Sequence, residues 1–183
     1  MQAYHASRGQ LEVGAVLESR FAGNVYAYQS RVLASAFSEG VAVLKSVLLA
    51  EVLRSGGKGD HIRVALREMV TEAVREQYYQ DRPSRTTAVF ASPSLEAALA
   101  FAGVTNQERH HLYLCTIEDS NAFITDADFI RAYDVLAPIS EQLGFLTDQA
   151  HAYWTAQRSP TPIPEILAQP GSVKITARAD WPT

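Results

Sequence analysis

The sequence contains little cysteine, little lysine and no long apolar run, and each shortage excludes a class of protein. Cys115 is the only cysteine among 183 residues, so no disulfide can form within the chain. The formal net charge is −4 and most cations are arginines, so no overall basic field is available for a nucleic-acid backbone. The longest apolar stretch, residues 41–53, is interrupted by Lys45 and Glu51 and is too short to span a bilayer. No cationic segment followed by an apolar run opens the chain, so we expect a soluble, cytoplasmic protein, with non-classical export left open.

The spacing of apolar residues predicts a single α+β domain over residues 1–183, with a split, antiparallel-rich mixed sheet and helices packed against it. Apolar or alternating runs predict strands at residues 4–7, 15–17, 87–91, 110–117, 165–167 and 172–178. Helical spacing predicts helices at Val41–Arg54, 62–79 and 126–135, and another within 140–158 that ends at Tyr153-Trp154. The tyrosine-rich segment 21–30 is interpreted as a loop or irregular strand. Gln169-Pro170-Gly171 fits a type II turn, so residues 165–178 are predicted to form a hairpin.

Residues 82–102 combine a polar turn, a short strand and a helix. Ser84 and Arg85 lie in the turn that leads into the strand. Ser92 is predicted to cap the helix with Pro93 in its first position, and Gly103 is predicted to end it. The turn is therefore a candidate for holding a small polar or anionic group.

The helix predicted at residues 62–79 has a charged face that we expect to be solvated. Its members are Arg63, Arg67, Glu68, Glu72, Arg75 and Glu76. The segment before it, SGGKGD at residues 55–60, lacks the earlier glycine and the following Ser or Thr of a phosphate loop, so it is interpreted as a flexible connection.

Three short patterns follow one another along the chain in an order typical of a known superfamily. They are Tyr4-His5-Ala6-Ser7 followed by Gly14, then Val89-Phe90-Ala91 followed by Ala97, Ala98 and Ala102, and finally Glu165 at the start of a strand. Together they resemble the ADP-ribosyltransferase superfamily, in its diphtheria-toxin-like and poly(ADP-ribose)-polymerase-like branch, which uses a spaced His, Tyr and Glu. The chain also resembles a group of small bacterial proteins with an H…PSR…E pattern.

The resemblance implies an ADP-ribosyltransferase-like fold, NAD as substrate, and transfer of ADP-ribose to a macromolecular acceptor, either protein or nucleic acid. Glu165 would be the catalytic carboxylate, which accepts a hydrogen bond from a ribose hydroxyl and stabilises the positive charge that develops on the sugar. The implied NAD-binding set is His5 on the other ribose, Ala6 and Ser7 at the strand edge for the carboxamide, Ser84 and Arg85 on the pyrophosphate, and Phe90 and Tyr153 as aromatic faces.

The sequence departs from the superfamily pattern at the tyrosine, where it has Val89 or Phe90. Tyr79 is an alternative second aromatic face, and Glu141 and Glu118 are alternatives for the acid. The missing tyrosine hydroxyl motivates a second hypothesis, a non-catalytic nucleotide- or protein-binding module with the same fold. A toxin of this fold is a third.

The sequence gives less support to two other kinds of site, a thiol nucleophile and a metal site. Cys115 lies in an apolar strand without an orienting motif, so a thiol nucleophile paired with His110 or His111 is not favoured. The two histidines are neighbours in a strand and therefore point to opposite faces, which disfavours a shared metal.

Overall fold

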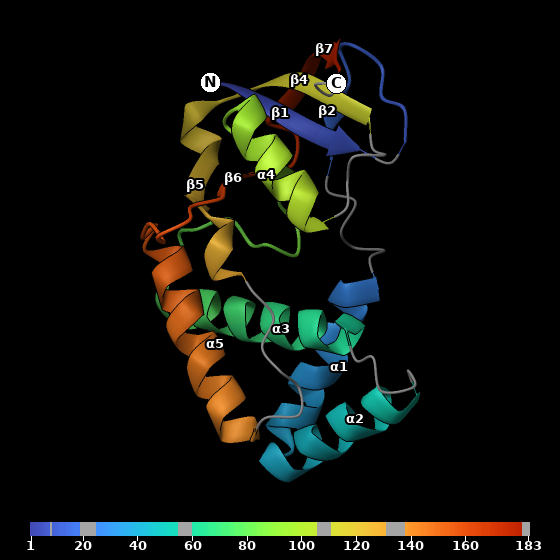
Figure 1. The fold of residues 1–183 in the computed structure, drawn as a ribbon, viewed down its shortest axis with the longest axis vertical. Coiled ribbons are helices and arrows are strands. Elements are labelled where there is room, and N and C mark those ends of the chain that lie inside the picture. The colour runs from blue at the N-terminus through green and yellow to red at the C-terminus, as the bar shows by residue number, and fades with distance from the viewer. Residues whose placement is uncertain (8, 19–24, 55–59, 106–110, 131–137, 181–183) are drawn as a thin grey trace.

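The computed structural model describes residues 1–7, 9–18, 25–54, 60–105, 111–130 and 138–180. Most strands lie at one end of the molecule, and helices α1, α2, α3 and α5 lie toward the other (Figure 1). The α+β prediction is confirmed. One sheet has the order β1-β4-β7-β2 and the other β3-β6-β5, and every pairing between described strands is antiparallel. The strands are β1 (Gln2–Ser7), β2 (Val16–Leu17), β3 (Val89–Ala91), β4 (His111–Ile117), β5 (Ala122–Asp126), β6 (Pro164–Ala168) and β7 (Val173–Ala179).

The helices of the described segments are α1 (Val25–Ser38), α2 (Val41–Arg54), α3 (Asp60–Tyr78), α4 (Leu95–Thr105) and α5 (Ile139–Trp154), with 3₁₀ turns η2 (Asp119–Asn121) and η3 (Ala127–Phe129). The predicted bounds of α2 are confirmed at both ends, and α5 ends at Trp154 as predicted. No helix within the described ranges is both long and apolar enough to cross a membrane.

Strand β6 lies between two hydrophobic clusters, and this determines where its side chains point. Ile166 and Ala168 pack in the cluster between the two sheets, whereas Leu167 packs in the cluster formed mainly by the helices. Because successive residues of a strand alternate between faces, Glu165 shares the face of Leu167 and points toward the helices. The strand is paired with β3 at residues 166–168 and with β5 along its whole length, where Glu165 lies opposite Thr125, so Glu165 is anchored in the sheet.

The predicted hairpin over residues 165–178 is wrong. β6 and β7 belong to different sheets, and the turn between them carries the chain from one sheet to the other. Gly171 has the positive φ of +82° that the turn prediction required. Its N–H donates to the carbonyl of Leu17 in β2, while Gln169 N–H donates to the carbonyl of Asn121 in η2, so the turn is tied to one sheet and to the 3₁₀ turn that precedes β5. The residue types of a turn do not determine which strands the two flanking segments pair with.

Segment 21–30 is helical where it is described, because α1 begins at Val25. The loop or irregular-strand prediction is therefore wrong from residue 25 onward, and residues 21–24 lie outside the described residues. Local propensity favours strands for β-branched and aromatic residues. Here tertiary packing overrides it, since Leu33 and Ala36 lie three residues apart on the helix and are both buried.

The predicted ends of α4 are also wrong. Ser94, not Ser92, caps the helix, because its Oγ accepts from the Ala97 N–H at 3.1 Å. Ser92 is instead bridged to Tyr4 of β1 by two backbone hydrogen bonds of 2.8 Å. The helix continues through Gly103.

The helix predicted at residues 126–135 is not observed where that segment is described. Asp126 ends β5, and its carboxylate accepts backbone N–H groups of Asp128, Ser159 and Ile163. It therefore caps the short turn η3 instead of starting an α-helix, and residues 131–135 lie outside the described residues. Pro138 precedes α5 at its N-cap.

Candidate active site

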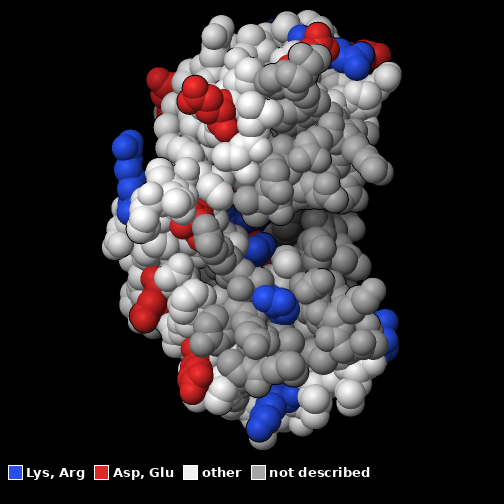
Figure 2. Space-filling view, in the orientation of Figure 1, with Lys and Arg blue, Asp and Glu red and all other residues white. Residues whose placement is uncertain are grey.

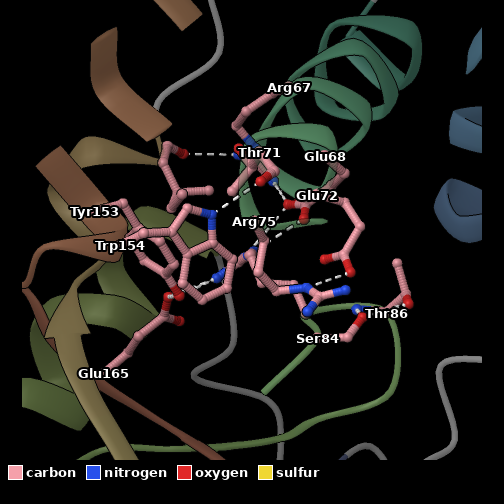
Figure 3. A network of polar contacts seen from close by, with 12 residues as sticks. Arg67, Glu68, Thr71, Glu72, Arg75, Ser84, Thr86, Tyr153, Trp154 and Glu165 are labelled. Carbon is pink, nitrogen blue, oxygen red and sulfur yellow. Dashed lines mark hydrogen bonds and ion pairs between the residues drawn. The ribbon is translucent and has the colours of Figure 1, made fainter. Parts of the chain in front are cut away.

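Arg85 is the centre of a buried polar cluster that joins α3, α5 and β6. Its Nε donates to Glu68 Oε2 at 2.9 Å, and its Nη2 donates to Glu68 Oε1 at 3.3 Å. Its Nη1 donates to Glu165 Oε1 at 2.6 Å and to the Tyr153 hydroxyl at 2.5 Å. Tyr153 in turn donates to the same Glu165 oxygen at 2.5 Å. Glu165 and Tyr153 lie on one side of the cluster, and the α3 residues Arg67 and Glu68 on the other (Figure 3).

The exposed fractions are 7% for Arg85, 4% for Glu68, 3% for Glu165 and 0% for Tyr153. Such burial is costly unless charges are paired. Arg67 supplies the second positive charge of the cluster. Its Nη2 donates to Glu68 Oε1 at 2.5 Å, and its Nη1 donates to the carbonyl of Ile130. Two guanidinium groups therefore face two carboxylates.

The electrostatics follow from this packing. Burial alone would raise the pKa of Glu68, but Arg85 and Arg67 outweigh it and lower that pKa to about 2. Burial disfavours the charged form of Arg85, yet Glu68, Tyr153 and Glu165 raise its pKa well above the usual value. Burial raises the pKa of Tyr153 well above its usual value, against the effect of Arg85 and with a contribution from Glu165. The tyrosine thus keeps the proton that it donates.

Glu165 uses its two oxygens differently. Oε1 accepts from both Arg85 and Tyr153, whereas Oε2 has no hydrogen-bond partner among the described residues. A carboxylate with one saturated and one unpartnered oxygen can accept a further hydrogen bond in a defined direction.

Local structure brings Arg85 and Tyr153 to this position. The carbonyl of Ser84 accepts the N–H groups of Thr87 and Ala88, which closes a tight turn at Arg85. Tyr153 is fixed through its backbone, because Thr125 Oγ1 donates to its carbonyl at 2.6 Å. The next residue, Trp154, donates its indole N–H to the carbonyl of Thr71 at 2.8 Å and so ties α5 to α3.

Phe90 and His5 lie beside the cluster. The Arg85 guanidinium carbon lies 4.9 Å from the centre of the Phe90 ring and 5.1 Å from that of Tyr153, within cation–π range. His5 Nδ1 lies 2.8 Å from the carbonyl oxygen of Phe90. A carbonyl can only accept, so Nδ1 carries a proton. Both His5 and Phe90 are half-buried and thus more exposed than the four buried polar residues of the cluster.

The backbone of β1 offers a donor and an acceptor next to His5. Tyr4 directs its N–H and C=O to Ser92, away from β4. Because the groups of alternate residues in a strand point to the same edge, those of Ala6 point in the same direction. This is the edge at which the superfamily resemblance implies a contact with a carboxamide. Ala6 and Ser7 are both half-buried.

The structure brings together Arg85, Phe90, Tyr153 and Glu165, and connects His5 to them through the Phe90 carbonyl. Ser84 does not join, because its Oγ bonds Thr86 Oγ1 at 2.7 Å.

The alternative residues lie elsewhere. Glu118 and Glu141 are exposed, and Glu118 accepts from the Asn121 side chain. Tyr79 bonds His151 Nδ1 at 3.0 Å. Cys115 is buried, and burial raises the pKa of its thiol to about 11, which agrees with its unsuitability as a nucleophile. No cluster of metal-ligating side chains occurs among the residues that the structure describes.

Glu68 is not among the site residues predicted from the sequence, because the charged face of α3 was expected to be solvated. That expectation is wrong for the central part of this face. Glu68 is buried, and Arg75, which pairs with Glu72 at 2.6 Å, is largely buried too. One signal was present in the sequence, because Glu68 is flanked by Leu66 and Met69 of the apolar stripe. A charged residue so placed is buried if a counter-charge arrives from elsewhere in the chain.

The cluster and its surroundings combine a buried carboxylate, a half-buried aromatic ring and a histidine with a strand edge whose polar groups point away from β4. Such groups can exchange hydrogen bonds with a polar ligand, and the carboxylate can stabilise positive charge. Figure 2 shows Lys or Arg atoms near the middle of this face of the molecule, between the strand-containing half and the helical half.

The model of a family described as "Protein of unknown function (DUF2441)" matches residues 16–180, a range that contains Glu68, Arg85, Tyr153 and Glu165 but not His5 of β1. A search of curated proteins found no match. Because the family model covers most of the chain, the protein belongs to the DUF2441 family.

Proposed function

We propose that the protein is an NAD-dependent ADP-ribosyltransferase-like enzyme, which cleaves the nicotinamide–ribose bond and transfers ADP-ribose to a macromolecular acceptor. The observation that carries the proposal is the state of Glu165, a carboxylate held in the sheet with one oxygen bonded to Arg85 and Tyr153 and the other without a hydrogen-bond partner among the described residues. Two residues that the superfamily resemblance selected, Arg85 and Tyr153, bond Glu165 directly. Phe90 lies against the Arg85 guanidinium, and His5 bonds the Phe90 carbonyl.

The chemistry requires the bond between ribose C1′ and the nicotinamide nitrogen to break, with the electron pair leaving on neutral nicotinamide. Positive charge then develops on the ribose, and Glu165 Oε2 would stabilise it while accepting a hydrogen bond from a ribose hydroxyl. A nucleophile of the acceptor forms the new bond to C1′ and releases its proton to solvent. In this proposal His5 binds the other ribose, the Ala6 backbone binds the carboxamide and Phe90 stacks on nicotinamide. A cytoplasmic location goes with it, because NAD is an intracellular metabolite.

The test is NAD consumption and incorporation of labelled ADP-ribose by the full chain, with Glu165→Gln as the critical variant. Glutamine still accepts hydrogen bonds from Arg85 and Tyr153 but carries no charge, so we expect a loss of at least about a hundredfold in kcat, as for other groups that stabilise transition-state charge. Glu118→Gln and Glu141→Gln, at exposed glutamates, are matched controls that should keep full activity. Circular dichroism verifies that each variant is folded. Equal turnover by wild type and Glu165→Gln would refute the role of Glu165.

Two observations favour the second candidate, a non-catalytic nucleotide- or protein-binding module. The polar groups of Arg85 and Tyr153 are hydrogen-bonded to other residues of the protein. The sequence also has Val89 or Phe90 at the position of the superfamily tyrosine. Calorimetry with NAD separates the two candidates. Binding without turnover supports the module, and the absence of binding refutes an NAD site of either kind.

A further inference from the structure

Arg85 is occupied by protein groups to an extent that disagrees with its expected role on a pyrophosphate. A guanidinium has five N–H groups. Four of those on Arg85 point at Glu68, Tyr153 and Glu165. A phosphate ligand would have to displace these partners and leave buried carboxylates without a counter-charge, which is strongly unfavourable.

We propose that Arg85 is a positioning residue for Glu165, and that Glu68 is the group that holds Arg85 in place. Arg85 and Tyr153 together occupy Oε1 of Glu165, so that Oε2 is the oxygen that meets the ribose hydroxyl. This inference rests on the proposed function, and it assigns to Glu68 a role that the sequence did not suggest.

The geometry of the cluster explains why an arginine is needed. A planar guanidinium can bind two carboxylates on different edges at once, here Glu68 through Nε and Nη2, and Glu165 through Nη1. A lysine ammonium is a single point on a flexible stem and cannot span both. Arg67 in turn holds Glu68, so the contacts that orient Glu165 extend from the Ile130 carbonyl through both arginines.

The kinetic test separates positioning from ligand binding. Arg85→Lys and Glu68→Gln should lower kcat for NAD by about tenfold or more, as misplacement of a catalytic group does, while the Kd for NAD measured by calorimetry stays within about twofold, because neither residue touches NAD. Arg75→Lys is the matched control, since Arg75 also pairs with an α3 glutamate and should leave both constants unchanged. A Kd for NAD raised about tenfold or more in Arg85→Lys, with kcat at saturation unchanged, would show a pyrophosphate ligand and overturn the inference.

A second measurement does not depend on activity. In urea unfolding, Glu68→Gln and Arg85→Lys break the same contact, so the double variant should lose less stability than the two single variants together. We expect a coupling of about tenfold or more in the unfolding equilibrium constant, whereas Arg85→Lys and the exposed Glu76→Gln should act independently.

The two measurements distinguish the possible failures. Additive effects of Glu68→Gln and Arg85→Lys would overturn the inference whether or not the protein acts on NAD. A wild-type protein that binds and cleaves no NAD would overturn the proposed function and, with it, the positioning role in catalysis, even if the coupling were found.

Discussion

Acid should weaken the protein through Glu68, and replacing this residue by glutamine isolates the effect. Both oxygens of the carboxylate accept charged hydrogen bonds, from Arg67 Nη2 at 2.5 Å and from Arg85 Nε at 2.9 Å. Glutamine has nearly the same shape and keeps one acceptor oxygen, but like protonated glutamate it carries no charge. The variant therefore mimics the acid form at every pH.

The magnitude follows from the pKa. In the folded protein it is lowered from 4.5 to about 2, a difference worth about 3 kcal/mol at about 1.4 kcal/mol for each pH unit. Because the folded pKa is depressed, this stability is fully present above about pH 5 and is lost as the pH falls through the folded pKa. Glu68→Gln should thus be about 3 kcal/mol less stable than wild type at pH 7 and within about 0.5 kcal/mol of it at pH 2.

The assay is urea unfolding followed by circular dichroism at several pH values between 7 and 2, with the difference between variant and wild type plotted against pH. Other carboxylates titrate in both proteins, so their contribution cancels. Glu76→Gln on the same helix is the control, because its side chain is 67% exposed and its ion-pair distance is 3.8 Å. A difference that stays constant from pH 7 to pH 2 would show that Glu68 carries no depressed pKa and would refute the reasoning.

Two further predictions concern the end of α5 and the buried thiol. Ala156 has a φ of 53° directly after the helix, where its N–H and that of Gln157 close a Schellman-type cap, so Ala156→Gly should raise the unfolding free energy by about 0.5–1 kcal/mol. Urea unfolding measures this change, Gly171→Ala at a φ of +82° should change stability in the opposite direction, and a destabilised Ala156→Gly would contradict the strain argument. Cys115 is fully buried with a thiol pKa raised to about 11, so a disulfide reagent should label the native protein at least about a hundredfold more slowly than the urea-unfolded chain. Rapid labelling of the native protein would show that the thiol is accessible.

Much of the local structure was predictable because its causes are local. The bounds of α2, the end of α5 and the positive φ of Gly171 depend on residues within a turn or two in the sequence. The residue types at the candidate site were also evident, since Arg85, Phe90 and Glu165 stand out by chemistry and by order along the chain. Whether these residues lie close together in the folded protein, however, depends on the tertiary structure.

Tertiary structure decided three matters that the local sequence does not determine. β6 and β7 separate into different sheets because each pairs with strands distant in sequence, and the turn between them suits either arrangement. Glu68 is buried because Arg85 reaches it from seventeen residues away, whereas a charged helix face considered alone is expected to be solvated.

The role of Arg85 is the third matter that the tertiary structure decided. Its residue type indicates affinity for carboxylate or phosphate, and the sequence determined that much. Which of the two it binds depends on whether carboxylates are already within reach of its five N–H groups. Only the packing of α3 and β6 around the turn at Arg85 supplies Glu68 and Glu165 there.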